Sequence, residues 1–240
     1  MPDYQVLMTA AGLDSNAFKA ASLGPIKSEI LVGKKTILEH AIGSYFIKTS
    51  KNILVLLKGE FTPKTLKQLM FLEKGIENLI LENQTSGALC SALMAIDLID
   101  LNLPLFIAPA DSYVSEDVST LYNRFLESDA IAGTVLFESS ESRWSYARTL
   151  KNFQIVEMSE KDTISSFAST GTFFFRTARD FVEAAQWVLV ENFNTNGEFY
   201  ISSTINHLVM NGYHVHGELL EENMSYHPLS SPADCLKEMQ

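Results

Sequence analysis

Asp111 is the residue whose type and position most clearly point to chemistry. It follows an apolar run at residues 104–110, and such a run is typical of a buried parallel strand that ends in one charged side chain. Ligands of open α/β sheets bind beyond the carboxyl ends of the strands, so we expect Asp111 to be a metal ligand or a phosphate-side ligand. The alternative is that Asp111 only caps the turn into residues 115–117.

A second candidate site is the loop that follows the first apolar run, residues 4–10. This loop begins at Gly12 and continues to about residue 30, and ordered loops of such length are more often functional than not. Its lysines, Lys19 and Lys27, could meet the phosphates of a ligand. The alternative is that both side chains are simply solvated at the surface.

Gly87 lies at the start of a helical run that reaches Ile99, after a strand expected at residues 77–82. Because glycine lets the backbone come close to a ligand, the amide groups near Gly87 and Ala88 are expected to face the same sheet edge as Asp111. The alternative is that Gly87 only eases a tight turn from the strand into the helix.

Two further charged sites come from the second half of the chain. Lys161 follows an expected strand at residues 154–158 and could hold a substrate phosphate, or it could form a surface ion pair with Glu160 that contributes little stability. Glu198 precedes an expected helix at residues 201–210. A carboxylate at that position is favoured by the helix dipole, which alone would explain it structurally.

The remaining periodicity predicts the elements that must position these residues. Apolar runs predict further strands at 52–57, 130–137, 171–175 and 213–220, and capped or amphipathic segments predict helices at 36–49, 63–74, 112–127, 177–191 and from 232 onward. An alternating pattern at 144–149 and 154–158 predicts antiparallel strands, so the sheet should be mixed. We expect one α/β domain that spans residues 1–240.

The composition excludes several classes of function. The chain has 240 residues, of which 46% are hydrophobic and 20% charged, as expected for a globular protein with a large core. Its formal net charge of −11 argues against a nucleic-acid partner, although a few local cations would suffice for a small anionic ligand. No apolar run approaches the roughly 20 residues that cross a bilayer, so no membrane partner is expected.

The protein is expected to be cytoplasmic. The first three residues lead straight into the first expected strand, without a basic segment followed by an apolar export signal. Cys90 and Cys235 show no metal-ligand spacing and are interpreted as reduced thiols. The sequence pattern does not decide whether the chain is a monomer or a homodimer.

Taken in order along almost the whole chain, these motifs resemble those of the sugar-phosphate nucleotidylyltransferases. The likeness is strongest to the small single-domain members of bacterial capsule and surface-polysaccharide pathways. No single motif is specific, but their joint order and spacing are. The motifs are the segments 10–12, 33–40, 84–88, 107–114, 160–161, 171–175, 196–200 and 229–234.

The resemblance implies a fold and a reaction. The fold would be a Rossmann-like three-layer α/β/α sandwich with a mixed, mainly parallel sheet, of the nucleotide-diphospho-sugar transferase type. The reaction would move a nucleoside monophosphate from a nucleoside triphosphate to a phosphorylated acceptor, such as a sugar phosphate, and release pyrophosphate. Such a transfer depends on positioning and charge neutralisation more than on covalent catalysis, so one Mg²⁺ ligand and a few cations could carry it.

The resemblance also implies roles for individual residues. Lys161 would hold the acceptor phosphate, and Asp111 would bind Mg²⁺. The implied catalytic residues are Asp111, Lys161 and Lys27; the nucleotide-binding residues are Ala10, Ala11, Gly12, Gln84, Gly87 and Ala88; and the acceptor-binding residues are Glu160, Gly171 and Glu198.

The sequence departs from the family pattern in the nucleotide loop and at a metal ligand. Members usually carry Gly-x-Gly-x-Arg after the first strand, whereas residues 12–16 lack the second glycine and the arginine, and Asp14 adds negative charge. Lys27 is the equivalent of the lysine in a Pro-Lys-Pro motif, and the second magnesium carboxylate falls at Pro228. These losses motivate an alternative function: a catalytically lapsed member that binds a nucleotide or nucleotide-sugar as a regulatory or partner-binding protein.

Overall fold

The computed structural model describes residues 3–12, 15–48, 50–72 and 75–239. The strands are β1 (Gln5–Ala10), β2 (Leu31–Val32), β3 (Lys35–Thr36), β4 (Lys51–Leu57), β5 (Ile76–Leu81), β6 (Leu105–Pro109), β7 (Ser112–Val114), β8 (Ala132–Glu138), β9 (Ser145–Thr149), β10 (Ile155–Glu160), β11 (Phe167–Phe175), β12 (Val215–Leu219) and β13 (Tyr226–Pro228). The helices are α1 (Ser15–Ala20), α2 (Ile37–Tyr45), α3 (Pro63–Leu72), α4 (Ala88–Leu93), α5 (Ser119–Glu127), α6 (Ala178–Val190), α7 (Ser202–Met210) and α8 (Pro232–Glu238).

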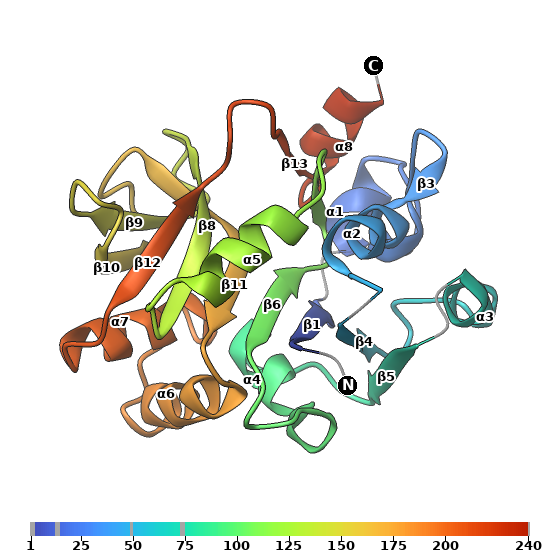
Figure 1. Ribbon diagram of the computed structural model, residues 1–240. Helices are drawn as coiled ribbons and strands as arrows, with labels where there is room; N and C mark the ends of the chain where they lie inside the picture. Colours follow the sequence, from blue (N-terminus) through green and yellow to red (C-terminus); the bar gives the residue numbers. More distant parts are fainter. Residues whose placement is uncertain (1–2, 13–14, 49, 73–74, 240) are drawn as a thin grey trace.

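The main sheet is mixed, and its parallel half corresponds to the buried apolar runs of the sequence (Figure 1). Strands β6, β1, β4 and β5 lie side by side and parallel. The first three are mostly buried, as expected for apolar segments covered on both faces, whereas the edge strand β5 is mostly half-buried or exposed. Strand β11 pairs antiparallel with β6, and β8 and β9 both pair with β11. The predicted antiparallel pair at 144–149 and 154–158 is confirmed as β9 and β10.

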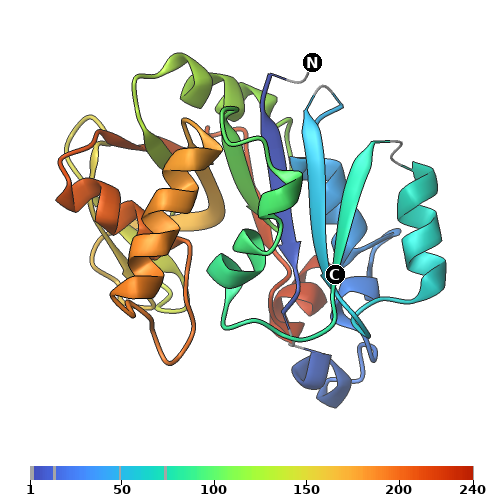
Figure 2. The ribbon, with the colours of Figure 1, turned by 90° about the horizontal axis from the view of Figure 1, so that it is seen from below.

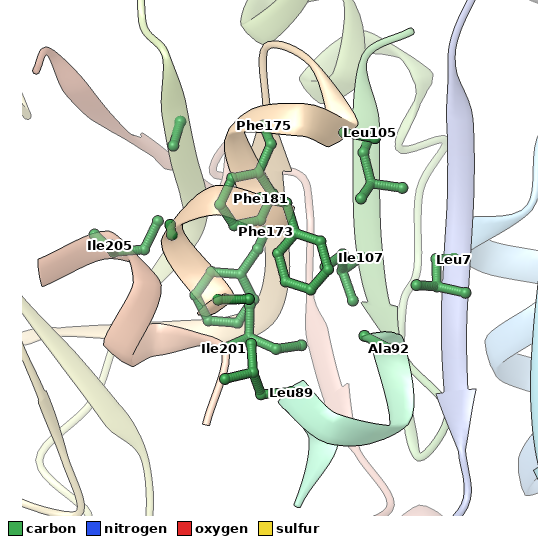
Figure 3. Close-up of a cluster of buried hydrophobic side chains, with 14 of the residues drawn as sticks. Leu7, Leu89, Ala92, Leu105, Ile107, Phe173, Phe175, Phe181, Ile201 and Ile205 are labelled. Atoms are coloured by element: carbon green, nitrogen blue, oxygen red, sulfur yellow. The ribbon is translucent and has the colours of Figure 1, made fainter. Parts of the chain in front are cut away.

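Helices cover both faces of this sheet and give three layers (Figure 2). On one face, Leu89 of α4, Phe181 of α6 and Ile205 of α7 pack against side chains of β1, β6 and β11 (Figure 3). On the other face, α2 and α5 pack through residues such as Tyr122 against Phe106 of β6. The predicted three-layer α/β/α fold is confirmed. None of the described helices is long and apolar enough to span a bilayer.

Strand β11 is longer than the predicted 171–175, and Gly171 lies inside it rather than at its start. The register against β8 shifts between Ser169 and Phe173, and Gly171 has a φ of +84°, a conformation that residues with a Cβ rarely adopt. Pro109, the last residue of β6, lies next to this position. The glycine therefore marks an irregularity that redirects β11 at the edge where β6 ends.

Helix α4 is shorter than predicted. The run expected to reach Ile99 is α-helical only from Ala88 to Leu93, and a short 3-10 turn follows. The side chain of Gln5 forms two hydrogen bonds, of 2.8 and 2.7 Å, with the backbone of Asp100. This contact with the start of β1 holds the chain in place between the 3-10 turn and β6.

Helix α5 also begins later than predicted, at Ser119, because residues 112–114 form β7 instead. Strand β7 pairs antiparallel with β13, which places Pro228 opposite Ser112. The partner strand comes from the far C-terminal part of the chain, so a tertiary contact decides the conformation here. Local propensity could not have revealed it.

Phe106→Ala should destabilise the protein strongly. Phe106 is fully buried, and its ring stacks on that of Tyr122 with the centroids 4.0 Å apart. The resulting cavity should lower the free energy of unfolding by about 3–5 kcal/mol, measured by urea denaturation. Val190→Ala, at a residue that is 81% exposed, should change it by less than about 0.5 kcal/mol. Equal losses in the two variants would contradict this assignment of the core.

Candidate functional site

A pocket opens at the carboxyl ends of the parallel strands β1 and β6, the edge at which α/β proteins commonly bind ligands. Its volume is about 690 Å³, within the range of small-molecule sites. The site residues that the family resemblance implies all line it: Ala10, Ala11, Gly12, Lys27, Gln84, Gly87, Ala88, Asp111, Glu160, Lys161, Gly171 and Glu198. The structure therefore brings them together, and their individual roles remain predictions.

Asp111 follows β6 and is paired with a lysine at this edge. Lys27 Nζ lies 2.8 Å from Asp111 Oδ2, and the side chains of the lysine and the aspartate are 13% and 34% exposed. In the turn that follows, the carboxylate of Asp117 accepts the backbone N–H of Ser119 at 2.9 Å. Asp111 thus lines the pocket with its charge balanced by Lys27.

The loop that supplies Lys27 is more structured than predicted. Residues 12–30 contain α1 and a 3-10 turn at Lys27–Glu29. Phe18 of α1 is fully buried in a cluster shared with α8, and Figure 1 shows these two helices beside each other. Lys27 Nζ lies 5.5 Å from the centre of the Phe18 ring, so this packing helps to place the lysine. Lys19 is exposed on α1 and does not line the pocket.

The two glycines of the predicted nucleotide side differ in what surrounds them. At Gly87, φ is +108° and a Cβ would lie 2.5 Å from the carbonyl oxygen of Phe199, so the close approach is to the protein's own backbone. Two backbone hydrogen bonds, of 2.8 and 3.1 Å, hold Phe199 to the segment around Gly87. At Gly12 no atom of the described residues lies within 4 Å of the Cβ position, which leaves room for a ligand. Asp14 lies outside the described residues.

Glu160 enters the pocket from the end of β10. Its Oε2 atom accepts hydrogen bonds from the hydroxyl groups of Ser145 and Ser202, the latter at 3.0 Å. Burial raises the pKa of Glu160 above its usual value, although both serine hydroxyls and the charge of Lys161 lower it. A carboxylate held in this way can still accept hydrogen bonds from the hydroxyl groups of a ligand.

Lys161, Tyr200 and Glu198 form a hydrogen-bonded chain in the same part of the pocket. Lys161 Nζ donates to Tyr200 Oη at 2.9 Å, and Tyr200 Oη donates to Glu198 Oε2 at 2.6 Å. The bond to Tyr200 raises the pKa of Lys161, so the lysine carries its positive charge at neutral pH. Glu160 and Lys161 are thus each tied to residues of other segments, rather than forming only a pair with each other.

Several polar residues of the pocket are absent from the set predicted from the sequence. They include Arg143, Trp144, Ser145, Tyr200 and Ser202. Ser145 lies directly opposite Glu160 in the antiparallel pair of β9 and β10, so a hairpin register would have identified it. Tyr200 follows Glu198 closely in the sequence, but no local pattern shows that its hydroxyl turns back to that carboxylate.

The donor set of the pocket fits Mg²⁺ as an ion that arrives together with phosphates. Among the described residues, no group of three or more His, Cys, Asp or Glu side chains could hold a metal ion by itself. Mg²⁺ is commonly bound through one or two carboxylates plus substrate phosphates and water, and Asp111 provides one such carboxylate. Pro228, where the resemblance places a second magnesium carboxylate, lies opposite Ser112 on the neighbouring strand.

Comparison with known families decides the relationship. A family model described as nucleotidyl transferase matches residues 22–221. The chain belongs to the nucleotidyl transferase family. The matched segment includes the pocket residues from Lys27 to Glu198, and the family expected from the motifs is confirmed. A comparison with the sequences of curated proteins gives no match.

Solved structures share the fold of this nucleotidyl transferase family member along nearly its whole length. A nucleoside-diphosphate-sugar pyrophosphorylase from Vibrio cholerae RC9 has a TM-score of 0.81 at 18% identity, over 98% of this chain and 99% of its own. A putative glucose-1-phosphate thymidylyltransferase from Bacillus anthracis has a TM-score of 0.74 at 16% identity, over 98% of this chain and 94% of its own. The inositol-1-phosphate CTP transferase from T. maritima has a TM-score of 0.72 at 15% identity, over 100% of this chain and 97% of its own.

Gly87→Ala should loosen the contact between the two sides of the pocket. Its Cβ would collide with the backbone of Phe199, and alanine disfavours the positive φ, so the free energy of unfolding should fall by at least about 1 kcal/mol. Hydrogen exchange at the amides of Leu89 and Phe199 should become faster. Gly212→Ala has a similar positive φ but open space around it, and it should leave this exchange unchanged. Unchanged exchange in Gly87→Ala would contradict the close contact.

The raised pKa of Glu160 predicts a pH dependence of stability. Its folded pKa lies above the usual value of 4.5, so the folded state binds this proton more tightly than the unfolded chain. The resulting contribution to stability is complete below pH 4.5 and is lost as the pH rises through the folded pKa.

Glu160→Gln keeps an acceptor for Ser145 and Ser202 but removes the titration. Urea denaturation at a series of pH values should therefore show a smaller fall in the free energy of unfolding for the variant than for the wild type. Identical pH profiles for the two proteins would contradict the burial of this carboxylate.

Proposed function

We propose that the protein transfers a nucleoside monophosphate from a nucleoside triphosphate to a phosphorylated acceptor and releases pyrophosphate. One observation carries the proposal: a single pocket unites the Lys27–Asp111 ion pair at the strand ends with the chain of Lys161, Tyr200 and Glu198. A transfer between two phosphorylated molecules requires two such polar centres around one cavity. Membership of the nucleotidyl transferase family supports the same class of reaction.

The reaction is a substitution at phosphorus. An oxygen of the acceptor phosphate attacks the α-phosphorus of the nucleotide, and the bond from that phosphorus to the oxygen bridging to the β-phosphate breaks. Pyrophosphate leaves with the bonding electrons. The protein has to align the two anions and offset their charge. Lys27 would leave Asp111 and bind the phosphate chain of the nucleotide, while Lys161 would bind the acceptor phosphate. Mg²⁺, held by Asp111 together with nucleotide phosphates, would supply further charge neutralisation.

The nucleotide is proposed to lie over the end of β1 and the loop before α4. The open space at Gly12 leaves room for it beside the backbone of Ala10 and Ala11. Gln84 offers a side-chain amide that can both donate and accept, which suits the edge of a base. The backbone around Gly87 and Ala88 would line the ribose.

The acceptor is proposed to be a phosphorylated polyol. Glu160 and Glu198 offer carboxylate oxygens to hydroxyl groups, and Lys161 offers an ammonium group to a phosphate. The bend at Gly171 lies against the same space. Two of the similar solved structures are named for glucose 1-phosphate and inositol 1-phosphate, which belong to this chemical class. A sugar phosphate destined for capsule or surface polysaccharide, activated in the cytoplasm, fits these features.

A second candidate function is binding of a nucleotide or nucleotide-sugar without turnover. Residues 12–16 contain no lysine or arginine, and Pro228 stands where a second carboxylate would help to hold a metal ion. Lys27 already balances the charge of Asp111. A protein of this kind would bind its ligand without Mg²⁺ and act as a regulatory or partner-binding protein.

Pyrophosphate release tests the transfer directly. The full chain, incubated with each nucleoside triphosphate, Mg²⁺ and a panel of sugar and inositol phosphates, should release pyrophosphate in a coupled phosphate assay. Asp111→Asn should lower the rate by at least about 100-fold, because the carboxylate charge at the phosphates is lost. Asp97→Asn, an exposed residue outside the pocket, should keep the wild-type rate.

The opposite result would favour the second candidate. Folded protein that releases no pyrophosphate across the panel, but binds a nucleotide-sugar tightly in the absence of Mg²⁺ in calorimetric titrations, is not a transferase of this class.

A further inference from the structure

Arg143 is held in one orientation at the wall of the pocket. Its Nη1 and Nη2 atoms donate to the two carboxylate oxygens of Asp234 at 2.7 and 2.9 Å, and Nε donates to Glu141 at 2.7 Å. The guanidinium also lies 4.0 Å from the centre of the Trp144 ring. A planar group fixed by a bidentate ion pair and an aromatic face loses little further freedom when it binds a ligand.

These contacts leave part of the guanidinium available. An arginine side chain has five N–H groups, and the contacts with Asp234 and Glu141 use three of them. Arg143 lines the pocket, and its side chain is 35% exposed. It can therefore donate hydrogen bonds to a ligand without giving up Asp234.

The C-terminal segment links Arg143 to Asp111. Leu229 N donates to the carbonyl oxygen of Asp111 at 2.8 Å, and a few residues later Asp234 holds the guanidinium. Between them, Ser230 lines the pocket and its hydroxyl donates to Asp234 at 3.3 Å. One short stretch of chain thus connects the strand-end carboxylate with the arginine.

On its other side, Arg143 is linked to the proposed acceptor residues. Trp144 and Ser145 follow it directly and both line the pocket, and the hydroxyl of Ser145 donates to Glu160. Arg143 is therefore connected by short segments to both polar centres of the pocket, the one at Asp111 and the one at Glu160.

The balance of charged side chains in the pocket indicates a role for Arg143 in binding phosphate. Among the described residues, the charged lining side chains are the cations of Lys27, Arg143 and Lys161 and the carboxylates of Glu60, Asp111, Glu160 and Glu198. A reaction between two phosphorylated molecules brings further negative charge into this acidic cavity. Arginine is the side chain best suited to bind phosphate oxygens in such a place, because its donors are planar and its charge is permanent.

We propose that Arg143 is a phosphate-binding residue of this pocket, presented by Asp234 and Trp144. Its remaining N–H groups bind oxygens of the nucleotide's phosphate chain or of the acceptor phosphate. The proposal rests on the proposed function, since it assigns a further residue to the same substrates. Both substrates share the ligand chemistry, and separate arms of the experiment distinguish them.

Calorimetric titrations of the full chain test the proposal. CTP, UTP, dTTP and inorganic tripolyphosphate probe the nucleotide source, and glucose 1-phosphate and inositol 1-phosphate probe the acceptor source. Arg143→Gln should weaken the probes of at least one source by roughly 10- to 100-fold and leave cytidine, glucose and inositol unaffected. Arg148→Gln removes the same charge from an exposed ion pair with Glu157 outside the pocket and should leave every affinity unchanged.

Two further variants separate phosphate binding from folding. Arg143→Gln leaves Asp234 without its cation, so it should lower the thermal unfolding temperature, whereas the double variant Arg143→Gln with Asp234→Asn should recover much of it. Affinity for phosphorylated probes should stay weak in both. Arg143→Lys, which keeps the charge but not the planar fork, should lose less affinity than Arg143→Gln.

The outcomes are distinguishable. Recovery of affinity together with stability in the double variant would overturn the proposal, and so would equal effects on phosphorylated and unphosphorylated probes. If the wild type releases pyrophosphate and Arg143→Gln keeps the KM for both substrates, only this inference fails. If binding depends on Arg143 but no pyrophosphate is released, only the proposed function fails. A wild type that binds no phosphorylated probe overturns both.

Discussion

The Lys27–Asp111 ion pair is the interaction on which the pocket depends. A carboxylate at the end of a buried strand is partly withdrawn from water and needs a cation or hydrogen-bond donors nearby. Lys27 meets that need at 2.8 Å and connects the loop after β1 to the end of β6, so the two neighbouring parallel strands share one cavity. The same pair can serve chemistry, since an arriving phosphate chain offers Lys27 a second anionic partner. A structural requirement and a proposed catalytic one are met by the same two side chains.

Contacts between segments far apart in the chain close the pocket around that pair. The backbone of Phe199 fits against Gly87 so closely that no side chain could stand there, and this joins the proposed nucleotide side to the segment that carries Glu198. The bidentate bond between Arg143 and Asp234 joins the loop before β9 to α8. Because each contact uses groups that are themselves fixed by backbone hydrogen bonds or caps, the polar side chains are positioned before any ligand arrives.

Much of the fold and the membership of the pocket could be predicted from the sequence, for definite physical reasons. Apolar runs fix the parallel strands, and parallel strands bring their carboxyl ends to one edge, which is why Gly12 and Asp111 line one pocket. The sequence patterns misplaced an element where a strand pairs with a segment far away in the chain. Residues 112–114 form β7 because β13, from the C-terminal part of the chain, pairs with them. Arg143 and Tyr200 join the pocket through side-chain contacts that no local pattern encodes, whereas Ser145 follows from the register of the predicted hairpin.

We propose that one cavity binds two phosphorylated molecules between Asp111 and Lys161. The most direct test is a crystal structure of the protein with a nucleoside triphosphate and Mg²⁺, in which the position of the phosphates and the separation of Lys27 Nζ and Asp111 Oδ2 are measured. We expect phosphates between these two side chains, with the lysine moved from the carboxylate onto the phosphate chain. A nucleotide bound elsewhere on the molecule, with the pair still closed at 2.8 Å, would contradict it.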